Sequence, residues 1–292
     1  MNRTRRIQAA LLLLAAIAVV PLRATTYHPI AAVRAPNGSL FVLTAEDTVF
    51  AVNMGLSSGS VAGHFAFKTA GILTDMAYGE VGGQAMLFVS SSFSTGQTVL
   101  GRVQEFTTAG QPVQTWTIQH VVAGLTFDSA NQTVYFTSGD SPEIYAIAPQ
   151  PKSSPRYVAE VAGSSKLGAI TVDPSGQQFY IADVRQGTIF SMSVTGKGVA
   201  QVGQVGTPQA LLVDSTGQQL IVADSTRKQV VALSLAKNPG APRVLAPAGS
   251  FQGPAGLAWF DASHLLVADQ NKATVSLVDV SAARLLYSLP IS

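Results

Sequence analysis

The chain repeats a β-rich unit with a period of about 41 residues, and this periodicity limits its possible folds more than any other feature. The repeat is clearest in residues 168–183, 209–224 and 255–269, each of which ends in two or more apolar residues, an alanine and an aspartate. The closing aspartates are 41 and 45 residues apart. A period of this size indicates a propeller or a solenoid.

Weaker copies of the unit precede these three segments. Residues 31–43, 75–89 and 124–136 each contain two short apolar runs with similar spacing. The whole chain after the amino terminus therefore consists of six units.

Each unit contains four short runs typical of β-strands, separated by Gly, Pro, Asn, Asp or Ser. The turns at 173–176 and 214–217 combine an aspartate, which can cap its own backbone, with a glycine, which accepts a positive φ. The first two strands of a unit are thus expected to form a hairpin. Runs such as 211–213 and 220–222 are apolar on both sides of the pleat, so both faces of each sheet must be covered.

Only neighbouring units can cover both faces of a four-stranded sheet. We therefore predict an all-β fold, a six-bladed β-propeller of four-stranded antiparallel meanders. The last blade is expected from Gly256 to Leu289, with the two termini meeting there. Whether residues 25–30 add a closing strand stays open.

The amino terminus has the pattern of an export signal. Arg3, Arg5 and Arg6 precede an apolar run over residues 9–20, and small residues follow near position 24. The run is too short to cross a hydrocarbon layer of about 30 Å as a helix. We predict a signal peptide over 1–24 and one propeller domain over 25–292, periplasmic or secreted and without a membrane span. A retained anchor is the alternative.

Charge and cysteine content exclude several classes of function. The whole chain has 18 Lys+Arg and 16 Asp+Glu, and loss of residues 1–24 would leave 14 basic and 16 acidic residues. Such a balance does not predict nucleic-acid binding. The chain has no cysteine, which excludes disulfides, thiolate metal sites, cysteine nucleophiles and a lipoprotein anchor.

Two segments resemble a known family of repeats. Residues 208–214 with 220–225, and 253–258 with 266–271, are similar to NHL repeats of six-bladed propellers, and the resemblance covers roughly residues 28–290. It implies a fold shared with TolB-like and strictosidine-synthase-like propellers, secreted lactonases and many binding or scaffold modules, and therefore no single activity. The chain departs from the pattern at Arg34, in Ala-Val-Arg where Val-Asp is expected, and at Gly79.

The histidines do not predict a metal site. His28, His64, His120 and His264 occupy unlike positions in their units, and no HxH or HExxH spacing occurs. His120 is kept as a candidate ligand-binding residue, because it immediately precedes an innermost strand, where loops gather around the channel.

The repeated aspartates Asp183, Asp224 and Asp269 suggest calcium ligands or a structural role. A structural role is favoured, since an aspartate at a strand end accepts hydrogen bonds from the following turn, whereas calcium needs six to eight converging oxygens. No Gly-x-Ser-x-Gly motif supports a hydrolase nucleophile. We predict no catalytic residue and no cofactor, with a divalent cation in the channel as the alternative.

Two further features depart from their repeats. Asp75 occupies a position at which the other units have Gly or Ala, and a carboxylate there needs a partner, either structural or a ligand. The segment 90–98 is longer than its counterparts and includes Phe93 among polar residues. We expect a loop there, which could act as a lid or a recognition loop.

The connections between second and third strands vary most, and we expect them to form the binding face. They offer a basic arc for an anionic or carbonyl-rich partner, next to Phe93, through Arg185, Arg227, Lys228 and Lys272, and Asn271 in the same loop is a further candidate binding residue. The sequence favours a non-enzymatic propeller that binds a small molecule or an exported protein. The alternative, from resemblance alone, is a metal-dependent lactonase-like or lyase-like enzyme.

If the signal prediction is right, the mature protein begins at Thr25. Mass spectrometry of the native protein should then give the mass of residues 25–292. A mass that includes Met1 would contradict the prediction.

Overall fold

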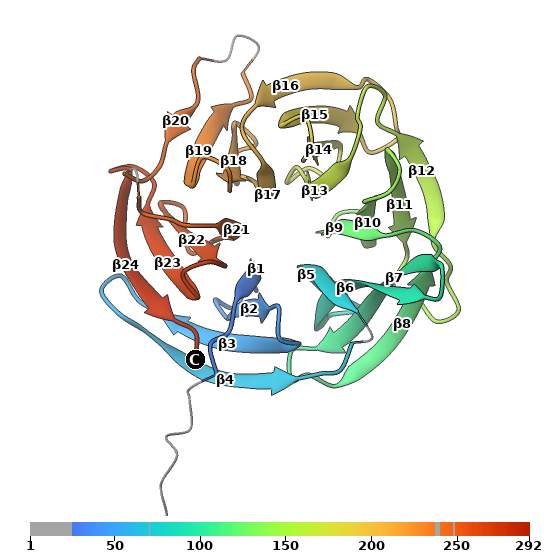
Figure 1. The fold of residues 1–292 in the computed structure, drawn as a ribbon, viewed down its shortest axis with the longest axis horizontal. Helices are drawn as coiled ribbons and strands as arrows, with labels where there is room; N and C mark the ends of the chain where they lie inside the picture. The colour runs from blue at the N-terminus through green and yellow to red at the C-terminus, as the bar shows by residue number, and fades with distance from the viewer. Residues whose placement is uncertain (1–24, 70, 237–239, 248) are drawn as a thin grey trace, which may run out of the picture.

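Six four-stranded sheets surround a central axis (Figure 1). The computed structural model describes residues 25–69, 71–236, 240–247 and 249–292. The predicted signal peptide, 1–24, lies outside the described residues. The all-β six-bladed propeller expected from the repeat is confirmed.

The strands follow one another around the ring in chain order. The first two blades are β1 (Pro29–Arg34), β2 (Leu40–Thr44), β3 (Thr48–Met54) and β4 (Gly59–Ala66), then β5 (Ile72–Val81), β6 (Gln84–Thr95), β7 (Thr98–Thr107) and β8 (Pro112–Ile118). The next two are β9 (Val122–Asp128), β10 (Thr133–Ser138), β11 (Glu143–Ile147) and β12 (Arg156–Glu160), then β13 (Leu167–Val172), β14 (Gln178–Asp183), β15 (Thr188–Ser193) and β16 (Ala200–Gln204). The last two are β17 (Pro208–Val213), β18 (Gln219–Asp224), β19 (Gln229–Ser234) and β20 (Arg243–Val244), then β21 (Pro254–Trp259), β22 (His264–Asp269), β23 (Thr274–Asp279) and β24 (Arg284–Pro290).

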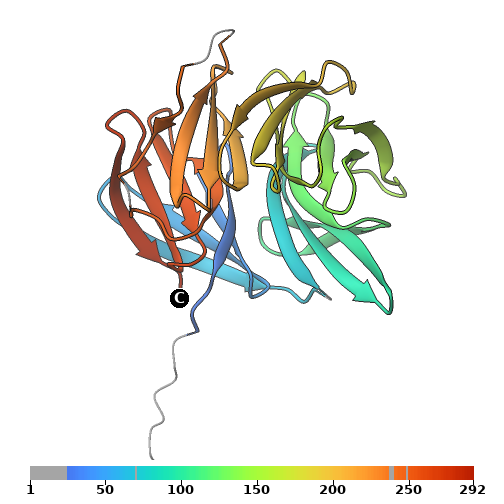
Figure 2. The same ribbon diagram turned by 45° about the horizontal axis from the view of Figure 1, so that its top comes forward.

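Every blade is a meander in which consecutive strands pair antiparallel. The first strand of each blade lies nearest the axis, and adjacent innermost strands contact one another all round the ring, β21 with β1 included (Figures 1 and 2). The last blade extends two residues before the predicted Gly256 and one beyond Leu289.

The hydrophobic core is divided into six clusters, one between each pair of neighbouring blades. Large side chains fill them without exposure to solvent: Phe88 and Phe136 lie between the second and third blades, and Phe179 lies between the third and fourth. This arrangement confirms that the two apolar faces of a blade are covered by its neighbours.

The first-to-second turns have the chemistry expected from their sequence. In the turn at 214–217, Asp214 Oδ1 accepts hydrogen bonds from the backbone N–H groups of Gln218 and Gln219, at 2.8 and 2.9 Å. Gly217 adopts a φ of +69°, which favours glycine. The aspartate therefore fixes the register of the hairpin.

The ring closes without exchanging a strand between the termini. β1 pairs only with β2, and residues 25–28 form no strand, which answers the question left open by the sequence. Instead the backbone N–H of Tyr27 donates to the carbonyl of Ile291 at 3.4 Å. The Tyr287 hydroxyl contacts the carbonyl oxygens of Gly55 and Ser58 at 2.8 and 2.6 Å. The first and last blades are thus held together by side-chain packing and a few hydrogen bonds.

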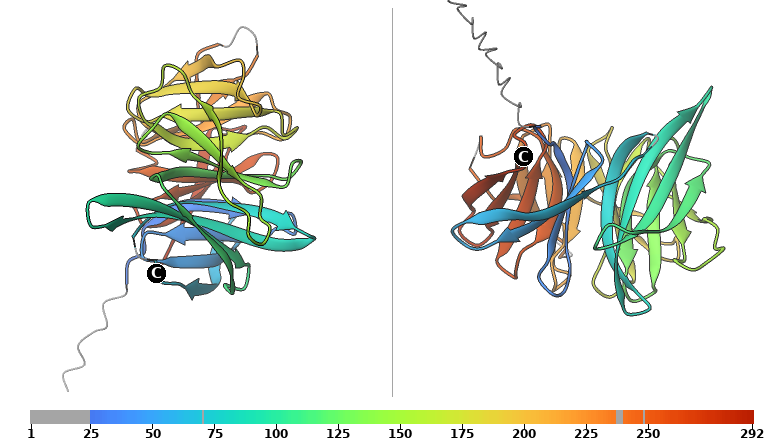
Figure 3. Two further views of the ribbon diagram at one scale, coloured as in Figure 1. Left: turned by 90° about the vertical axis from the view of Figure 1, so that its right-hand side faces the viewer. Right: turned by 90° about the horizontal axis from the view of Figure 1, so that it is seen from below.

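The segment predicted as a loop at 90–98 is instead part of a β-ribbon. β6 continues to Thr95 and pairs with β7 up to the rung Thr95–Thr98, and the turn uses Gly96 at a φ of +68°. The two strands satisfy each other's backbone groups, so the expectation of a loop over 90–98 is wrong. The ribbon projects beyond the neighbouring blades (Figure 3).

In the part of the chain that the structure describes, no helix is both long enough and apolar enough to cross a membrane.

The contact between β21 and β1 gives a prediction about closure. A Cβ at Gly256 would lie 2.7 Å from the Ala31 Cα, a backbone atom that cannot move aside cheaply. We expect Gly256→Ala to lower the free energy of unfolding by about 1–3 kcal/mol through overpacking. Urea unfolding monitored by circular dichroism measures this.

Gly63→Ala is the matched control, since a Cβ at Gly63 in β4 meets no atom within 4 Å. Its free energy of unfolding should stay within about 0.5 kcal/mol of the original protein. Equal losses in the two variants would show that the close approach of β21 and β1 is unimportant.

Candidate functional site

The innermost strands enclose a cavity of about 370 Å³ on the channel axis. Its lining runs from the middle of these strands to their C-terminal ends and includes Ala35 and Pro36 of the β1–β2 turn. The cavity thus lies toward the face that carries the first-to-second turns, called the turn face below. The opposite face, with the second-to-third turns and the crossings between blades, is the crossing face. The volume is at the lower end of the range of about 300–1,000 Å³ for small-molecule sites.

One residue from each innermost strand forms a ring at the inner end of the cavity, called the inner ring. The strand registers make these six positions equivalent, as the sequence predicted, and each lies within or directly after a register shift in its blade. The inner ring consists of Ala31, Asp75, Gly124, Ala169, Ala210 and Gly256. Five blades thus contribute at most a methyl group where the strands crowd together, and only Asp75 contributes a functional group.

Asp75 is held by two backbone N–H groups, one for each carboxylate oxygen. Met76 donates to Oδ1 and Leu125 donates to Oδ2, both at 2.8 Å. The second bond crosses from the second blade to the third, so Asp75 links two innermost strands. The residue keeps some accessible surface and is one of the residues that line the cavity.

Burial raises the pKa of Asp75 from an ordinary 3.8 to about 7. The hydrogen bonds from Leu125 and Met76 act in the opposite direction, but they do not outweigh the loss of hydration. The only other titratable side chains in the cavity lining are Arg34 and Tyr78. Near pH 7 Asp75 therefore changes between its neutral and charged forms.

A second ring, called the outer ring, lies three residues further along each innermost strand, and four of its six residues line the mouth of the cavity. It consists of Arg34, Tyr78, Phe127, Val172, Val213 and Trp259. Three residues of extended strand separate the two rings by about 10 Å. The Trp259 indole N–H donates to the carbonyl of Val213 at 3.0 Å, which fixes this aromatic side chain at the mouth.

Between the two rings the lining side chains are mainly alkyl, but hydroxyl and backbone groups make the accessible surface of the cavity nearly as polar as it is apolar. Ile170, Leu211, Leu212 and Leu257 contribute alkyl side chains, and Thr171 adds a hydroxyl group. Arg34 is exposed and forms no ion pair with any residue of the described ranges. The cavity is therefore a chamber of mixed polarity, with alkyl side chains along its walls, a carboxyl group at its inner end and a guanidinium group at its rim.

The sequence predicted Asp75 but missed the outer ring. Arg34 was noted only as a departure from the repeat, and it stands where the other blades have Tyr, Phe, Val or Trp. Both charged groups of the cavity are thus departures from their repeat. The sequence therefore marked both Arg34 and Asp75 as unusual, but only the folded structure shows that the two residues line one cavity.

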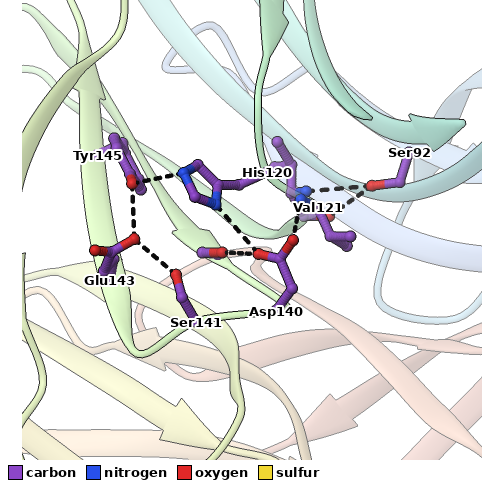
Figure 4. Close-up of polar contacts among 9 residues, drawn as sticks. Ser92, His120, Val121, Asp140, Ser141, Glu143 and Tyr145 are labelled. Atoms are coloured by element: carbon purple, nitrogen blue, oxygen red, sulfur yellow. Dashed lines mark hydrogen bonds and ion pairs between the residues drawn. The ribbon is translucent and has the colours of Figure 1, made fainter. Parts of the chain in front are cut away.

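His120 lies on the crossing face, in a hydrogen-bonded network with the third blade (Figure 4). Its Nε2 is 2.9 Å from the Tyr145 hydroxyl, which donates to Glu143 at 2.7 Å. Its Nδ1 is 3.4 Å from a carboxylate oxygen of Asp140. Because the Tyr145 proton goes to Glu143, His120 must donate through Nε2. The network ties the crossing between β8 and β9 to the β10–β11 turn.

The hydrogen bonds of this network also change the pKa values of two of its members, Glu143 and Tyr145. Hydrogen bonds from Tyr145 and Ser141 lower the pKa of Glu143. Burial, and then the bond to Glu143, raise the pKa of Tyr145. Both pKa shifts favour a protonated Tyr145 and an ionised Glu143, the two forms that the hydrogen bond between them requires. The cluster is therefore stabilised by its own hydrogen bonds.

The basic arc predicted on the crossing face is mostly engaged by the chain itself. Lys272 Nζ donates to the carbonyl oxygens of Ser250 and Gly249 at 2.6 and 3.3 Å. Lys228 and Asn271 bind the side chain and the backbone carbonyl of Gln252. These three residues fasten the segment that leads into β21.

The remaining predicted residues of this face are more accessible. Arg185 is exposed, and Arg227 lies 3.8 Å from Asp224 with 58% of its side chain exposed. Phe93 is partly buried in β6, and the Arg102 guanidinium lies 4.5 Å from its ring centre. Of the eight residues that the sequence suggested for binding, only Asp75 lines the channel cavity.

The repeated aspartates have the structural role that the sequence favoured. Asp224 is fully buried and accepts hydrogen bonds from the backbone N–H groups of Gly206, Thr207 and Arg227, at 2.9–3.1 Å. Each such aspartate therefore binds its own turn and the crossing segment that precedes its blade. The carboxylate oxygens are occupied by donors, an arrangement that does not suit a cation.

The residues of the channel do not fit a divalent cation. Asp75 is the only carboxylate in the lining, and each of its oxygens already accepts one backbone N–H group, so the two positions that remain are far fewer than the ligand set of a metal ion. Calcium needs six to eight oxygens, and zinc needs three or four nitrogen, sulfur or carboxylate ligands. Over the described ranges, no three His, Cys, Asp or Glu side chains are grouped to hold a metal ion.

Solved structures with this fold define the class of protein, a six-bladed β-propeller. The chain is similar to one in the crystal structure of a nidogen/laminin complex, with a TM-score of 0.66 and 16% identity over 91% of this chain and 92% of that one. It is also similar to a structural genomics protein of unknown function from Bacteroides thetaiotaomicron, with a TM-score of 0.65 and 12% identity over 88% and 70% of the two chains. No protein-family model and no curated protein matches the sequence. The similarity shows the fold alone, and the NHL resemblance stays a prediction.

The raised pKa of Asp75 gives a prediction about stability. In the folded protein the pKa is about 7, above the ordinary 3.8, so folding favours the protonated form. The contribution of Asp75 to stability is present below pH 4 and is lost as the pH rises through 7. Asp75→Ala introduces the alanine that three other blades have at this position. The unfolding free energy of the variant minus that of the original protein should be larger at pH 8 than at pH 5, by about 2.5 kcal/mol.

Urea unfolding of both proteins at pH 5 and pH 8 measures this difference. Changes at other titratable groups cancel, because they are common to the two proteins. A difference that stays constant with pH would contradict the raised pKa of Asp75.

Proposed function

We propose that this propeller is an exported, non-enzymatic binding module that holds a small organic ligand in the channel cavity. The observation that carries the proposal is the cavity itself: a chamber of about 370 Å³, with alkyl side chains and some polar groups along its walls, one carboxyl group inside and aromatic side chains at its mouth. Sites of this kind usually bind small molecules, because apolar walls supply affinity and a few polar groups fix orientation.

Export is part of the proposal and is supported by the signal pattern of residues 1–24. The NHL resemblance is compatible with a binding role, since such propellers often serve as binding or scaffold modules. One similar fold comes from a structure of a nidogen/laminin complex, so a protein partner on the crossing face is the second form of this proposal. The exposed Arg185 and Arg227 would serve such a partner.

An enzymatic role has no comparable support. The lactonase-like alternative requires a divalent cation in the channel, and the donor set around Asp75 does not fit one. The Asp140–His120 pair lacks a nucleophile, because the groups that His120 contacts are a carboxylate and a tyrosine whose proton is already given to Glu143.

The experiment compares the two faces with one set of probes. Small alkyl and aromatic fragments are screened against the mature protein by saturation-transfer NMR. Two variants are then tested with the fragments that bind: Leu212→Trp, which fills the cavity, and Arg185→Glu/Arg227→Glu, which alters the crossing face. We expect Leu212→Trp to abolish binding and the double variant to retain it, because Leu212 lies in the cavity wall.

Circular dichroism and thermal unfolding of Leu212→Trp check that the variant is folded. Binding that survives in Leu212→Trp but is lost in the double variant would move the site to the crossing face. A screen without any binding fragment would contradict small-molecule binding in the channel.

A further inference from the structure

The polar groups at the two ends of the cavity specify the chemistry of its ligand. This inference rests on the proposed function and concerns the same cavity. It starts from Asp75, whose carboxylate offers about four acceptor positions, of which Met76 and Leu125 fill two. Asp75 keeps some accessible surface and is one of the residues that line the cavity.

No cation of the protein lies near this carboxylate within the cavity. Arg34 is the only basic residue in the lining, and it stands in the outer ring, about 10 Å along the axis. A charged group buried without a partner is costly, so a ligand that brings its own positive charge would gain from the site. An ammonium group suits it best, because it is small, donates up to three hydrogen bonds and fits among inner-ring residues no larger than alanine.

The outer end has the opposite charge preference. The Arg34 guanidinium is exposed beside the mouth and has no carboxylate partner in the described chain. Its fork of N–H donors is suited to a carboxylate or a phosphate, and it would repel a second cation at this end. Trp259 and Tyr78 flank the same opening with partly exposed rings.

We infer that the cavity binds an organic zwitterion, with an ammonium group on Asp75 at the inner ring, an apolar middle along the alkyl walls, and an acidic group on Arg34 at the mouth. The backbone spacing of about 10 Å between the rings sets the scale of the separation between the two charged ends of the ligand. The apolar middle distinguishes it from short α-amino acids, whose two charges are adjacent.

Linear ω-amino acids test this inference directly. Isothermal titration calorimetry at pH 8 is run with ω-aminohexanoate, ω-aminooctanoate and ω-aminodecanoate, and with octylamine and octanoate as single-charge controls. We expect the longer ω-amino acids to bind more tightly than octylamine, and octylamine more tightly than octanoate. The affinity should increase from ω-aminohexanoate to the two longer compounds, because the charges of the six-carbon compound are too close together to reach both rings.

Two variants separate the two ends. Asp75→Ala should weaken both ω-aminooctanoate and octylamine by about tenfold or more. Arg34→Gln should weaken ω-aminooctanoate alone and leave octylamine unchanged. Arg185→Glu, on the crossing face, is the matched control and should change none of these affinities. Thermal unfolding of each variant shows that it is folded.

Each other outcome overturns the inference. Octanoate binding as tightly as octylamine would mean that the inner end prefers an acid, and equal binding of octylamine to Asp75→Ala would show that the carboxylate is not used. If fragments bind the cavity but no amine does, the zwitterion is excluded and the proposed function stands. If neither fragments nor amines bind, both fail.

Discussion

Each blade of this protein has two apolar faces, and a sheet of four strands cannot cover either by itself. Burial between neighbouring blades is therefore the interaction on which the rest of the structure depends, and it accounts for the six separate core clusters. A row of blades would leave two faces exposed at its ends, so the ring must close. It does so without strand exchange, through Tyr27, Tyr287 and Ile291, because packing of the last blade on the first buries the remaining faces.

Ring closure also determines where ligands can bind. Six strands converge on the axis, and their inner-ring residues must be small, so space remains along the channel toward the turn face. A carboxylate at this depth is destabilising when it is charged, as the raised pKa of Asp75 indicates. Asp75 therefore costs stability at a position where the other blades have Gly or Ala. The proposed binding role accounts for this cost, because residues needed for function often lower the stability of a protein.

On the crossing face, charged side chains stabilise the fold by binding the protein's own backbone. Its aspartates bind backbone N–H groups of two successive segments, and Lys272 binds carbonyl groups that precede the last blade. Sequence variation among these turns was read as a sign of binding, but each turn must fasten a different crossing segment. Variation in a repeated loop therefore reflects local hydrogen bonding as much as it reflects recognition.

The sequence by itself determined the number of blades, the strands within each and the position of Asp75 in the inner ring, because periodicity, alternation of apolar residues and turn chemistry are local properties. It did not reveal that residues 90–98 continue a ribbon, since Ser and Thr occur in strands and loops alike. Nor could it bring Arg34 and Asp75 into one cavity. They belong to different blades and to different levels of the channel, and only the closed ring, which packs β1 against β5 around a common axis, makes the two charges the ends of a single site.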